Sequence, residues 1–466
     1  MPSEHPSKKG NLILLKFLRL ITVIHPYEVT KVLLLSFNIF LILAAYYMIK
    51  IVRDATLLED FDATTKNQMA GIQVFLLIFV IKAFSALASR VSRNNLINRV
   101  TMFFILNLGV IYIFFVTGLL GKTMSLVFYI WVGIFNLMVI AQFWGFTIDL
   151  YSEEEGKRLF PIIMFGANLG GFMGTYASKQ WIDPETINPM VVYQLILMAS
   201  LLLGIGIFMT NFIHRRELKQ DVQGPLPEEP KTLEEKPEED KPLEKKGGFR
   251  LVFKSRYLLY IALFVFLLNM VNTTGEWIVD SVFIGATNEA IESGTIAEEA
   301  TLANLANLKA NFFFIVNALT LFIQFFIVSR LFKRFGIRAA VFVLPFIAFG
   351  GNVAMSLGAT ILVVSWAKAL ENSTDYSLTN TTRHALFLIT SREEKYKAKA
   401  TIDAFFQRAG DVGSIALVGL GSGVFALSIE GVAAVNFAVA FFWILLCFLI
   451  VKEHKKQQEL KLVKEP

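Results

Sequence analysis

Several charged side chains lie within a long apolar part of this sequence, between Trp366 and Gly413. They are Lys368, Glu371, Asp375, Arg383, Asp403, Arg408 and Asp411. A charge at the middle of a membrane-spanning helix costs about 2.5 to 3.5 kcal/mol, so such residues usually face a wet interior and mark an ion or substrate path. The sequence therefore indicates transport across a membrane.

The spacing of these charges places them on shared helix faces. Lys368, Glu371 and Asp375 follow an i, i+3, i+7 pattern, and Asp403 and Asp411 follow i and i+8. Other expected helices carry the further charges Lys50, Arg53, Asp54, Lys82, Glu276 and Asp280. We expect these side chains to line a central cavity through which a charged substrate moves.

An alternative role for the charges is to pair with one another and hold helices together. Replacement of a buried ion pair by apolar residues is often neutral or stabilising, so many such pairs would be an inefficient source of stability. The pattern as a whole therefore favours a cavity. For Arg383 and Asp403 a purely structural role stays open, and Lys82 either pairs or faces the cavity.

The composition is that of an integral membrane protein. Hydrophobic residues make up 55% of the chain, 44 residues are Phe, and only 18% are charged, which is far more apolar than a soluble domain. The single cysteine, Cys447, excludes an internal disulfide. No complete Walker phosphate loop, metal-ligand cluster or nucleophile–base pair occurs, so we expect neither an enzyme nor a bound cofactor or metal.

Six apolar runs long enough to span a membrane precede a polar segment, and six follow it. The first six lie near residues 31–53, 69–89, 100–120, 124–148, 158–180 and 190–213. The second six lie near 257–284, 308–332, 337–358, 359–389, 398–424 and 430–452. We therefore expect an all-α integral membrane protein with twelve transmembrane helices in two six-helix halves.

The remaining regions complete this plan. We expect a cytoplasmic amphipathic surface helix at 1–30 and a first six-helix half at 31–213. A flexible, charged cytoplasmic linker at 214–254 should lead to the second six-helix half at 255–452, and a cytoplasmic tail should follow at 453–466. Basic residues follow every second span, as Arg90 and Arg330 do, which predicts that both termini lie on the cytoplasmic side of an inner membrane.

The two halves also resemble each other. Short segments after spans 2 and 8, and after spans 4 and 10, match at nearly the same offset, which indicates duplication. Six-helix halves joined by a long cytoplasmic loop are the plan of the major facilitator fold, in which the substrate lies near the membrane midplane. Gly166, Gly170, Gly171 and Gly174 recur at helical spacing in the fifth span, a pattern typical of close helix packing.

Three stretches resemble motifs of the ATP/ADP antiporter family, the nucleotide transporters of plastids and intracellular bacteria. One runs from Asp149 to Pro161 and includes Glu155-Gly-Lys-Arg158. A second comprises Asp375 to Arg383 and Glu394 to Asp403. The third, Lys50-Ile-Val-Arg53-Asp54, is similar to the family's first-span motif.

This resemblance implies exchange of ATP for ADP, or of related nucleotides. It implies that Glu155 and one of Lys397 or Lys399 are functional, since a polyphosphate needs basic partners from which it can be released. The implied partners are a small-molecule substrate, in this case a nucleotide, and the lipid bilayer. Nucleic acid is not among them.

Two other functions stay open. Met69 to Leu76 lacks the lysine that the family carries in its second span, and the charges of the expected cavity are nearly balanced. Both features suit a different charged or zwitterionic metabolite, moved with protons through Glu276, Asp280, Asp375 or Asp411. A non-transporting scaffold or sensor is the lesser alternative, because a scaffold has no reason to line its interior with charge.

Overall fold

The computed structural model describes residues 24–25, 28–88, 93–151, 153–223, 248–391 and 394–464, and these residues form helices and no strands. Most of the expected surface helix at 1–30 and most of the linker lie outside the described residues. The all-α membrane fold predicted from the apolar runs is confirmed, because eight described segments are long and apolar enough to cross a membrane.

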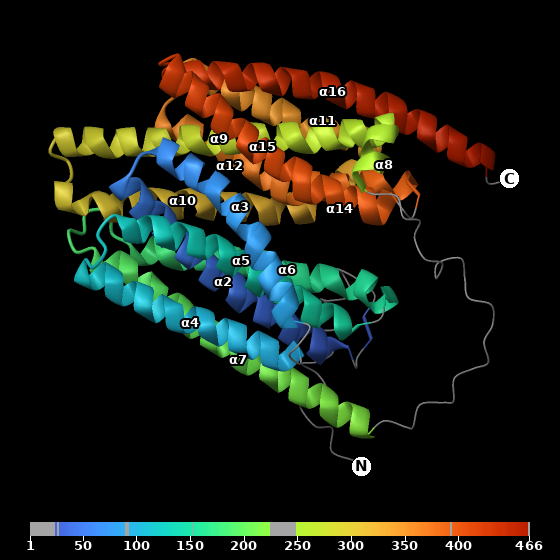
Figure 1. Cartoon of the computed structure of the whole chain (residues 1–466), viewed down its shortest axis with the longest axis horizontal. Coiled ribbons are helices and arrows are strands. Elements are labelled where there is room, and N and C mark those ends of the chain that lie inside the picture. The colour runs from blue at the N-terminus through green and yellow to red at the C-terminus, as the bar shows by residue number, and fades with distance from the viewer. Residues whose placement is uncertain are drawn as a thin grey trace, which may run out of the picture. The chain divides into compact units, whose positions relative to one another are not determined.

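The helices before the linker are long and almost uninterrupted (Figure 1). They are α2 (Val29–Asp60), α3 (Ala63–Ala88), α4 (Arg93–Thr117), α5 (Thr123–Asp149), α6 (Glu153–Trp181) and α7 (Met190–Gln223). Each covers most or all of one of the first six expected spans and extends beyond it at one or both ends.

The helices after the linker are more broken. They begin with α8 (Gly248–Lys254), which occupies the last residues of the expected linker at 214–254, and α9 (Arg256–Glu292). Next come η2 (Glu298–Ala300), α10 (Thr301–Phe322), η3 (Ile323–Val328) and α11 (Ser329–Ser356). They continue with α12 (Ile361–Thr374), η4 (Asp375–Thr379), α13 (Asn380–Leu386), η5 (Phe387–Ile389), η6 (Glu394–Ala398) and α14 (Lys399–Thr401). The last are η7 (Ile402–Phe406), α15 (Gln407–Val418), η8 (Gly419–Val424) and α16 (Ile429–Lys464).

The number of membrane crossings stays a prediction. One candidate segment, Glu298–Ser356, is 59 residues long and contains two of the expected spans. The helix breaks between them at Gly336, whose φ of 70° is a left-handed conformation that glycine adopts without strain. The expected spans at 359–389 and 398–424 are helical for most of their length but are not among the eight.

Three of the π-helical turns in the described residues, η4, η6 and η7, lie in the charged motifs. Turn η4 begins at Asp375 and turn η7 contains Asp403. An extra residue per turn re-aims the side chains beyond it, and π-turns occur frequently at functional sites. The helix face that holds Lys368, Glu371 and Asp375 therefore does not continue in the same direction beyond Asp375.

The described residues divide into two compact units. Unit 1 comprises the described residues within Met1–Asp62, Ile72–Asp221 and Ile284–Leu321. Unit 2 comprises the described residues within Ala63–Gly71, Val222–Phe283 and Phe322–Pro466. The first turns of α3 thus pack with helices from after the linker, while the end of α9 and nearly all of α10 pack with helices from before it.

The core of unit 1 is built on close contact between α2 and α6. A Cβ atom at Gly166 would lie 2.2 Å from the carbonyl oxygen of Ser36, and one at Gly170 would lie 2.3 Å from that of Phe40. Only glycine allows such an approach of two helix backbones, so the packing role predicted for these glycines is confirmed. Helices α4 and α7 lie side by side in the same unit (Figure 1), where Asn98 and Asn211 exchange two side-chain hydrogen bonds.

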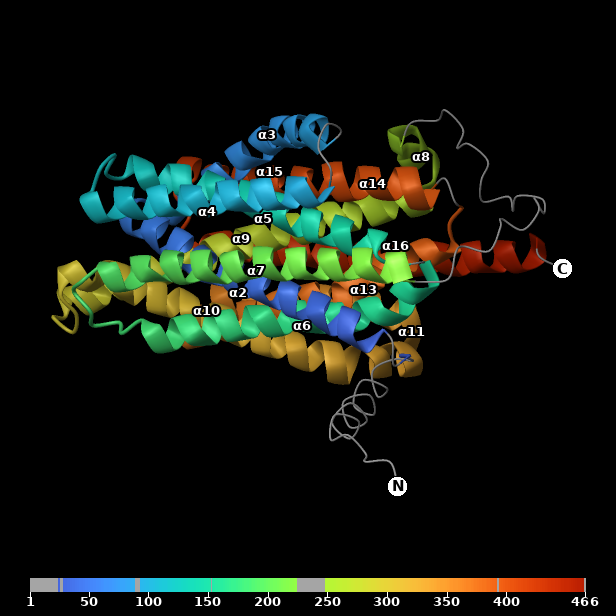
Figure 2. The same cartoon turned by 90° about the horizontal axis from the view of Figure 1, so that it is seen from below.

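Unit 2 is built around α9, α11 and α16, and Figure 2 shows the latter two from below. The buried rings of Phe264 and Trp443 lie 5.3 Å apart and join α9 to α16. The side-chain amide of Asn436 donates to Asn352 and to the backbone oxygen of Val271, so one polar group links three helices inside an apolar core. These contacts fix the face of α9 that carries charge.

Candidate functional site

The fully buried Lys368 lies at the centre of the charged part of unit 2. Its ammonium donates to Glu371 Oε1 at 2.6 Å, to Asn272 Oδ1 at 2.6 Å and to the Asn272 carbonyl oxygen at 2.8 Å. An ammonium has three donors, so these bonds use all of them. Gly275 permits the approach, because a Cβ there would lie 2.9 Å from Lys368 Nζ. Lys368 thus joins α12 to α9.

A second group of charges joins α9 to α15. Asp411 accepts hydrogen bonds from the Thr273 hydroxyl at 3.0 Å and from Arg408 Nη1 at 3.2 Å. The next residue of α9, Thr274, donates a hydrogen bond at 3.0 Å to Ser414, which lies about one turn beyond Asp411 in α15. The two helices are close because a Cβ at Gly410 would lie only 2.4 Å from the carbonyl oxygen of Phe266.

Glu276 and Asp375 lie near these two groups and are half-buried. The charge of Glu276 acts on the carboxyl groups of Glu371, Asp375 and Asp411. Among the residues that the structure describes, neither Glu276 nor Asp375 forms a direct ion pair. The region therefore holds more carboxylates than bases.

A third group lies at the turns η6 to η7. Arg383 Nη2 is 2.6 Å from Asp403 Oδ1, and Lys399 Nζ is 2.9 Å from Asp403 Oδ2. One carboxylate is thus shared by two bases from different helices. Lys397 is half-buried in η6, next to this group in the chain.

Asp280 has a partner that the sequence did not indicate. Lys66 Nζ lies 2.7 Å from Asp280 Oδ2, and both side chains are buried. Nearby, the indole N–H of Trp277 donates to the Thr64 hydroxyl at 3.2 Å. These contacts hold the first turns of α3 on α9 within unit 2.

Unit 1 contains a different arrangement, in which bases lie over aromatic rings. Lys50 Nζ lies 4.2 Å from the centroid of the Phe313 ring and 5.7 Å from that of Tyr47. Lys309 Nζ lies 6.0 Å from the same Phe313 centroid, and its side chain is buried. Arg53 lies 4.7 Å from the centroid of Tyr129.

We name these residues the basic–aromatic cluster. Its members are Lys50, Arg53, Lys309, Tyr47, Tyr129 and Phe313, from α2, α5 and α10. Arg53 also pairs with Asp54, with Nη2 2.6 Å from Oδ1. The cluster combines fixed positive charge with aromatic faces, which together suit an anionic ligand that carries an aromatic ring.

The remaining sequence-predicted residues lie elsewhere. Glu155 is half-buried in the first turn of α6. Lys82 lies on α3, but its side chain is outside the described part of the structure. Sequence reasoning grouped all these charges around one cavity. Within each unit they form local groups, and their roles toward a substrate stay predictions.

The beginning of α6 is tied to the beginning of α2. Arg158 Nη2 lies 2.7 Å from Glu28 Oε1, and Lys31 Nζ donates to the Leu150 carbonyl oxygen at 2.7 Å. Burial would raise the pKa of Glu28, but hydrogen bonds from Arg158 and from the His25 backbone N–H outweigh burial and hold this pKa below its usual range. This ion pair anchors the Glu155-Gly-Lys-Arg158 motif.

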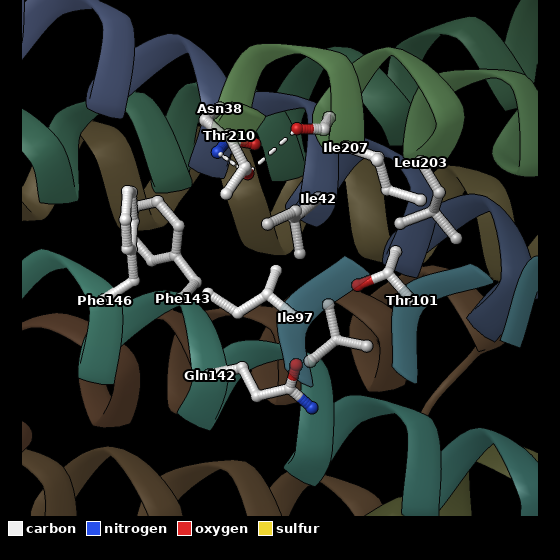
Figure 3. Close-up of a pocket in the computed structure, with 12 residues that line it drawn as sticks. Asn38, Ile42, Ile97, Thr101, Gln142, Phe143, Phe146, Leu203, Ile207 and Thr210 are labelled. Atoms are coloured by element: carbon white, nitrogen blue, oxygen red, sulfur yellow. Dashed lines mark hydrogen bonds between the residues drawn. The ribbon is translucent and has the colours of Figure 1, made fainter. Parts of the chain in front are cut away.

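A small cavity lies among α2, α4, α5 and α7 of unit 1 (Figure 3). Asn38 donates to the Thr210 hydroxyl at 2.7 Å at its edge. Both amide atoms of the buried Gln142 have no protein hydrogen-bond partner among the described residues. The space suffices for about one water molecule, so this cavity is far too small for a metabolite.

The fold is that of a multi-pass membrane protein of the major facilitator type. Similar solved structures include the nucleoside transporter NupG (TM-score 0.58, 10% identity, covering 90% of this chain and 98% of that one). A bacterial homologue of the lysosomal transporter Spinster, in an inward-facing conformation, matches with a TM-score of 0.58 and 14% identity over 93% and 99% of the two chains. At these identities the likeness concerns the fold alone.

The chain belongs to the TLC ATP/ADP transporter family, whose model matches residues 110–454. ADP,ATP carrier protein 1 of Chlamydia pneumoniae is 22% identical over 309 residues, which cover 60% of this chain and 56% of the relative. The protein of the same name from Chlamydia trachomatis serovar D is 24% identical over 344 residues, 67% and 61% of the two chains. The match therefore spans about three fifths of the relatives' length. The family resemblance inferred from the sequence motifs is confirmed.

Proposed function

We propose that this protein is a secondary transporter that exchanges adenine nucleotides across an inner membrane by alternating access, with both termini in the cytoplasm. The observation that carries the proposal is the basic–aromatic cluster, in which two lysines lie over the ring of Phe313. The family membership and the relatives' names as ADP,ATP carriers support the choice of nucleotide.

The cluster supplies what a nucleotide needs for reversible binding. Lysine and arginine make charge-assisted hydrogen bonds to phosphate oxygens, and the aromatic faces of Tyr47, Tyr129 and Phe313 suit a base or a ribose. A cation that already lies over a ring gains a phosphate partner without losing its apolar contact. The cluster therefore offers bases for the phosphates and rings for the base or the ribose of one nucleotide.

The paired charges of unit 2 have a complementary role in the proposal. Lys368, Arg383 and Arg408 are each neutralised by a carboxylate of the chain, so the unit is stable without a bound anion. An incoming phosphate would compete with Glu371, Asp403 or Asp411 for these bases. Such competition couples substrate binding to the contacts among α9, α12 and α15.

Alternating access requires contacts that break and re-form. The first turns of α3 pack in unit 2 through Lys66 and Asp280, whereas α3 from Ile72 onward packs in unit 1. Movement of the two halves against each other must therefore bend α3 near Gly71 or separate Lys66 from Asp280.

Counter-exchange of labelled ATP in liposomes preloaded with ADP tests the role of the cluster. We expect Lys309→Gln and Lys50→Gln each to lower exchange at least tenfold, because each removes a phosphate partner. Lys455→Gln changes an exposed lysine at the end of α16 and serves as the matched control. Equal exchange by all three folded variants would contradict the assigned role.

A proton-coupled facilitator is the second candidate function, and one observation favours it. Glu276 and Asp375 are half-buried carboxylates outside the direct ion pairs of the described residues, so they could carry a proton without breaking one. Asp280 and Asp411, by contrast, are bound to Lys66 and Arg408. Uptake driven by a pH gradient, without internal nucleotide, and lost in Glu276→Gln would support this candidate over exchange.

A further inference from the structure

The short helix α8 lies directly before a membrane span. It ends at Lys254, and α9, a candidate span, begins at Arg256. The Ser255 hydroxyl accepts a hydrogen bond from the Leu258 backbone N–H, which marks the start of the new helix. Because a single residue separates α8 from the span, α8 must lie at the level of the membrane surface.

One face of α8 packs against the rest of unit 2, and another face carries exposed aromatic rings. Val252 is fully buried, whereas Phe249 and Phe253 are 46% and 64% exposed. The Phe249 ring lies 5.1 Å from that of Phe405, which is 53% exposed in η7. We name Phe249, Phe253 and Phe405 the aromatic patch. The patch therefore extends from α8 onto η7.

The same helix carries a concentration of positive charge. Arg250, Lys254 and Arg256 are all exposed. No acidic residue occurs between Gly248 and Gly275. Aromatic residues are enriched at the boundary of the acyl chains, and basic residues near the cytoplasmic surface attract anionic headgroups.

We propose that α8 is an interfacial helix that binds anionic phospholipid, with Phe249 and Phe253 among the acyl chains and Arg250, Lys254 and Arg256 at the headgroups. Lipid is the occupant because α8 lies one residue from α9, a candidate span, and presents exposed aromatic rings beside exposed bases, the combination that the membrane interface recognises. Interfacial helices bind through this combination of apolar area and basic charge.

Lipid binding at α8 also bears on the transport machinery. A Cβ at Gly248 would lie 2.0 Å from the Thr401 hydroxyl and 2.6 Å from the Lys397 carbonyl oxygen, so α8 rests directly on the segment that carries Lys397, Lys399 and Asp403. The lipid-bound helix thereby positions this segment.

The test measures the thermal stability of the full-length protein in detergent during titration with phosphatidylglycerol or phosphatidylcholine. We expect phosphatidylglycerol alone to raise the Tm. In the variant Arg250→Gln/Lys254→Gln/Arg256→Gln the apparent affinity should fall by about fivefold for each charge removed. The variant Lys452→Gln/Lys455→Gln/Lys456→Gln removes three exposed bases at the end of α16 and should respond as wild type.

Three outcomes would overturn the proposal: equal responses to both lipids, an unchanged affinity in the α8 variant, or the same loss in the control variant. If the α8 variant proves unstable without lipid, Phe253→Ser provides the second measurement, because this side chain is mostly exposed. It should weaken phosphatidylglycerol binding without lowering the Tm in detergent alone. No nucleotide is present, so a failure here is separate from a failure of nucleotide exchange.

Discussion

Lys66 and Asp280 form a buried ion pair, 2.7 Å from Nζ to Oδ2, between the first turns of α3 and the middle of α9. The two residues lie on opposite sides of the linker in the sequence. Within unit 2, this pair joins the first turns of a helix from before the linker to a helix from after it.

Removal of one partner should destabilise the protein more than removal of both. Lys66→Met leaves the Asp280 carboxylate buried without this base, and the expected cost is about 3 to 5 kcal/mol. The double variant Lys66→Met/Asp280→Leu should recover most of this loss. Chemical denaturation in detergent measures the three free energies of unfolding. Additive effects of Lys66→Met and Asp280→Leu would show that the pair does not couple these helices.

The α2–α6 contact predicts a position-specific effect of a single methyl group. Gly170→Ala should destabilise the protein by about 1 to 3 kcal/mol, because its Cβ would lie 2.3 Å from the Phe40 carbonyl oxygen. Gly109→Ala in α4 is the matched control, since nothing lies within 4 Å of its Cβ, and it should be neutral or stabilise by up to about 1 kcal/mol. Similar Tm values for the two variants would contradict the close packing.

The Glu28–Arg158 pair predicts an acid-dependent loss of stability. The folded state holds the pKa of Glu28 below its ordinary value of 4.5, so the pair contributes fully above that value and its contribution is lost as the pH falls through the lower, folded pKa. The variant Glu28→Gln should therefore lose less stability than wild type between about pH 5 and pH 3, a range that brackets this ordinary value. Parallel Tm curves for the two proteins would contradict this assignment.

Replacement of the Phe313 ring should lower the affinity for substrate more than the maximal rate of exchange. Phe313→Leu keeps an apolar side chain but removes the aromatic face under Lys50 and Lys309, an interaction worth about 0.5 to 2 kcal/mol. The apparent KM for ATP exchange should rise by about two- to thirtyfold, with a smaller change in the maximal rate. Phe442→Leu, at an exposed position on α16, controls for general effects. An unchanged KM in Phe313→Leu would remove this ring from the binding site.

The fold could be predicted because apolar length is a local property. Runs that long have only one stable form in a bilayer, so each expected span is helical. The break at Gly336 and the glycine contacts of α6 could also be read locally. The π-turn at Asp375 could not, because no sequence pattern specifies where a helix admits an extra residue.

The candidate site was harder to predict because ion pairing depends on tertiary contacts. Lys66 and Lys309 are buried, yet each lies near the expected start of a span, where a lysine would ordinarily extend into water. The candidate residues Lys368 and Glu371 were found, because both stand out in an apolar run. That Lys368 also binds Asn272, and that Gly275 gives it room, could be learned only from coordinates.

Nucleotide exchange by the wild-type protein is the most direct test of the proposed function. Purified protein in liposomes preloaded with unlabelled ADP should take up labelled ATP, and uptake should be lost in empty liposomes and in the Glu155→Gln variant. Uptake that does not depend on internal nucleotide, or the absence of exchange by folded protein, would contradict the account and direct attention to a proton-coupled mechanism.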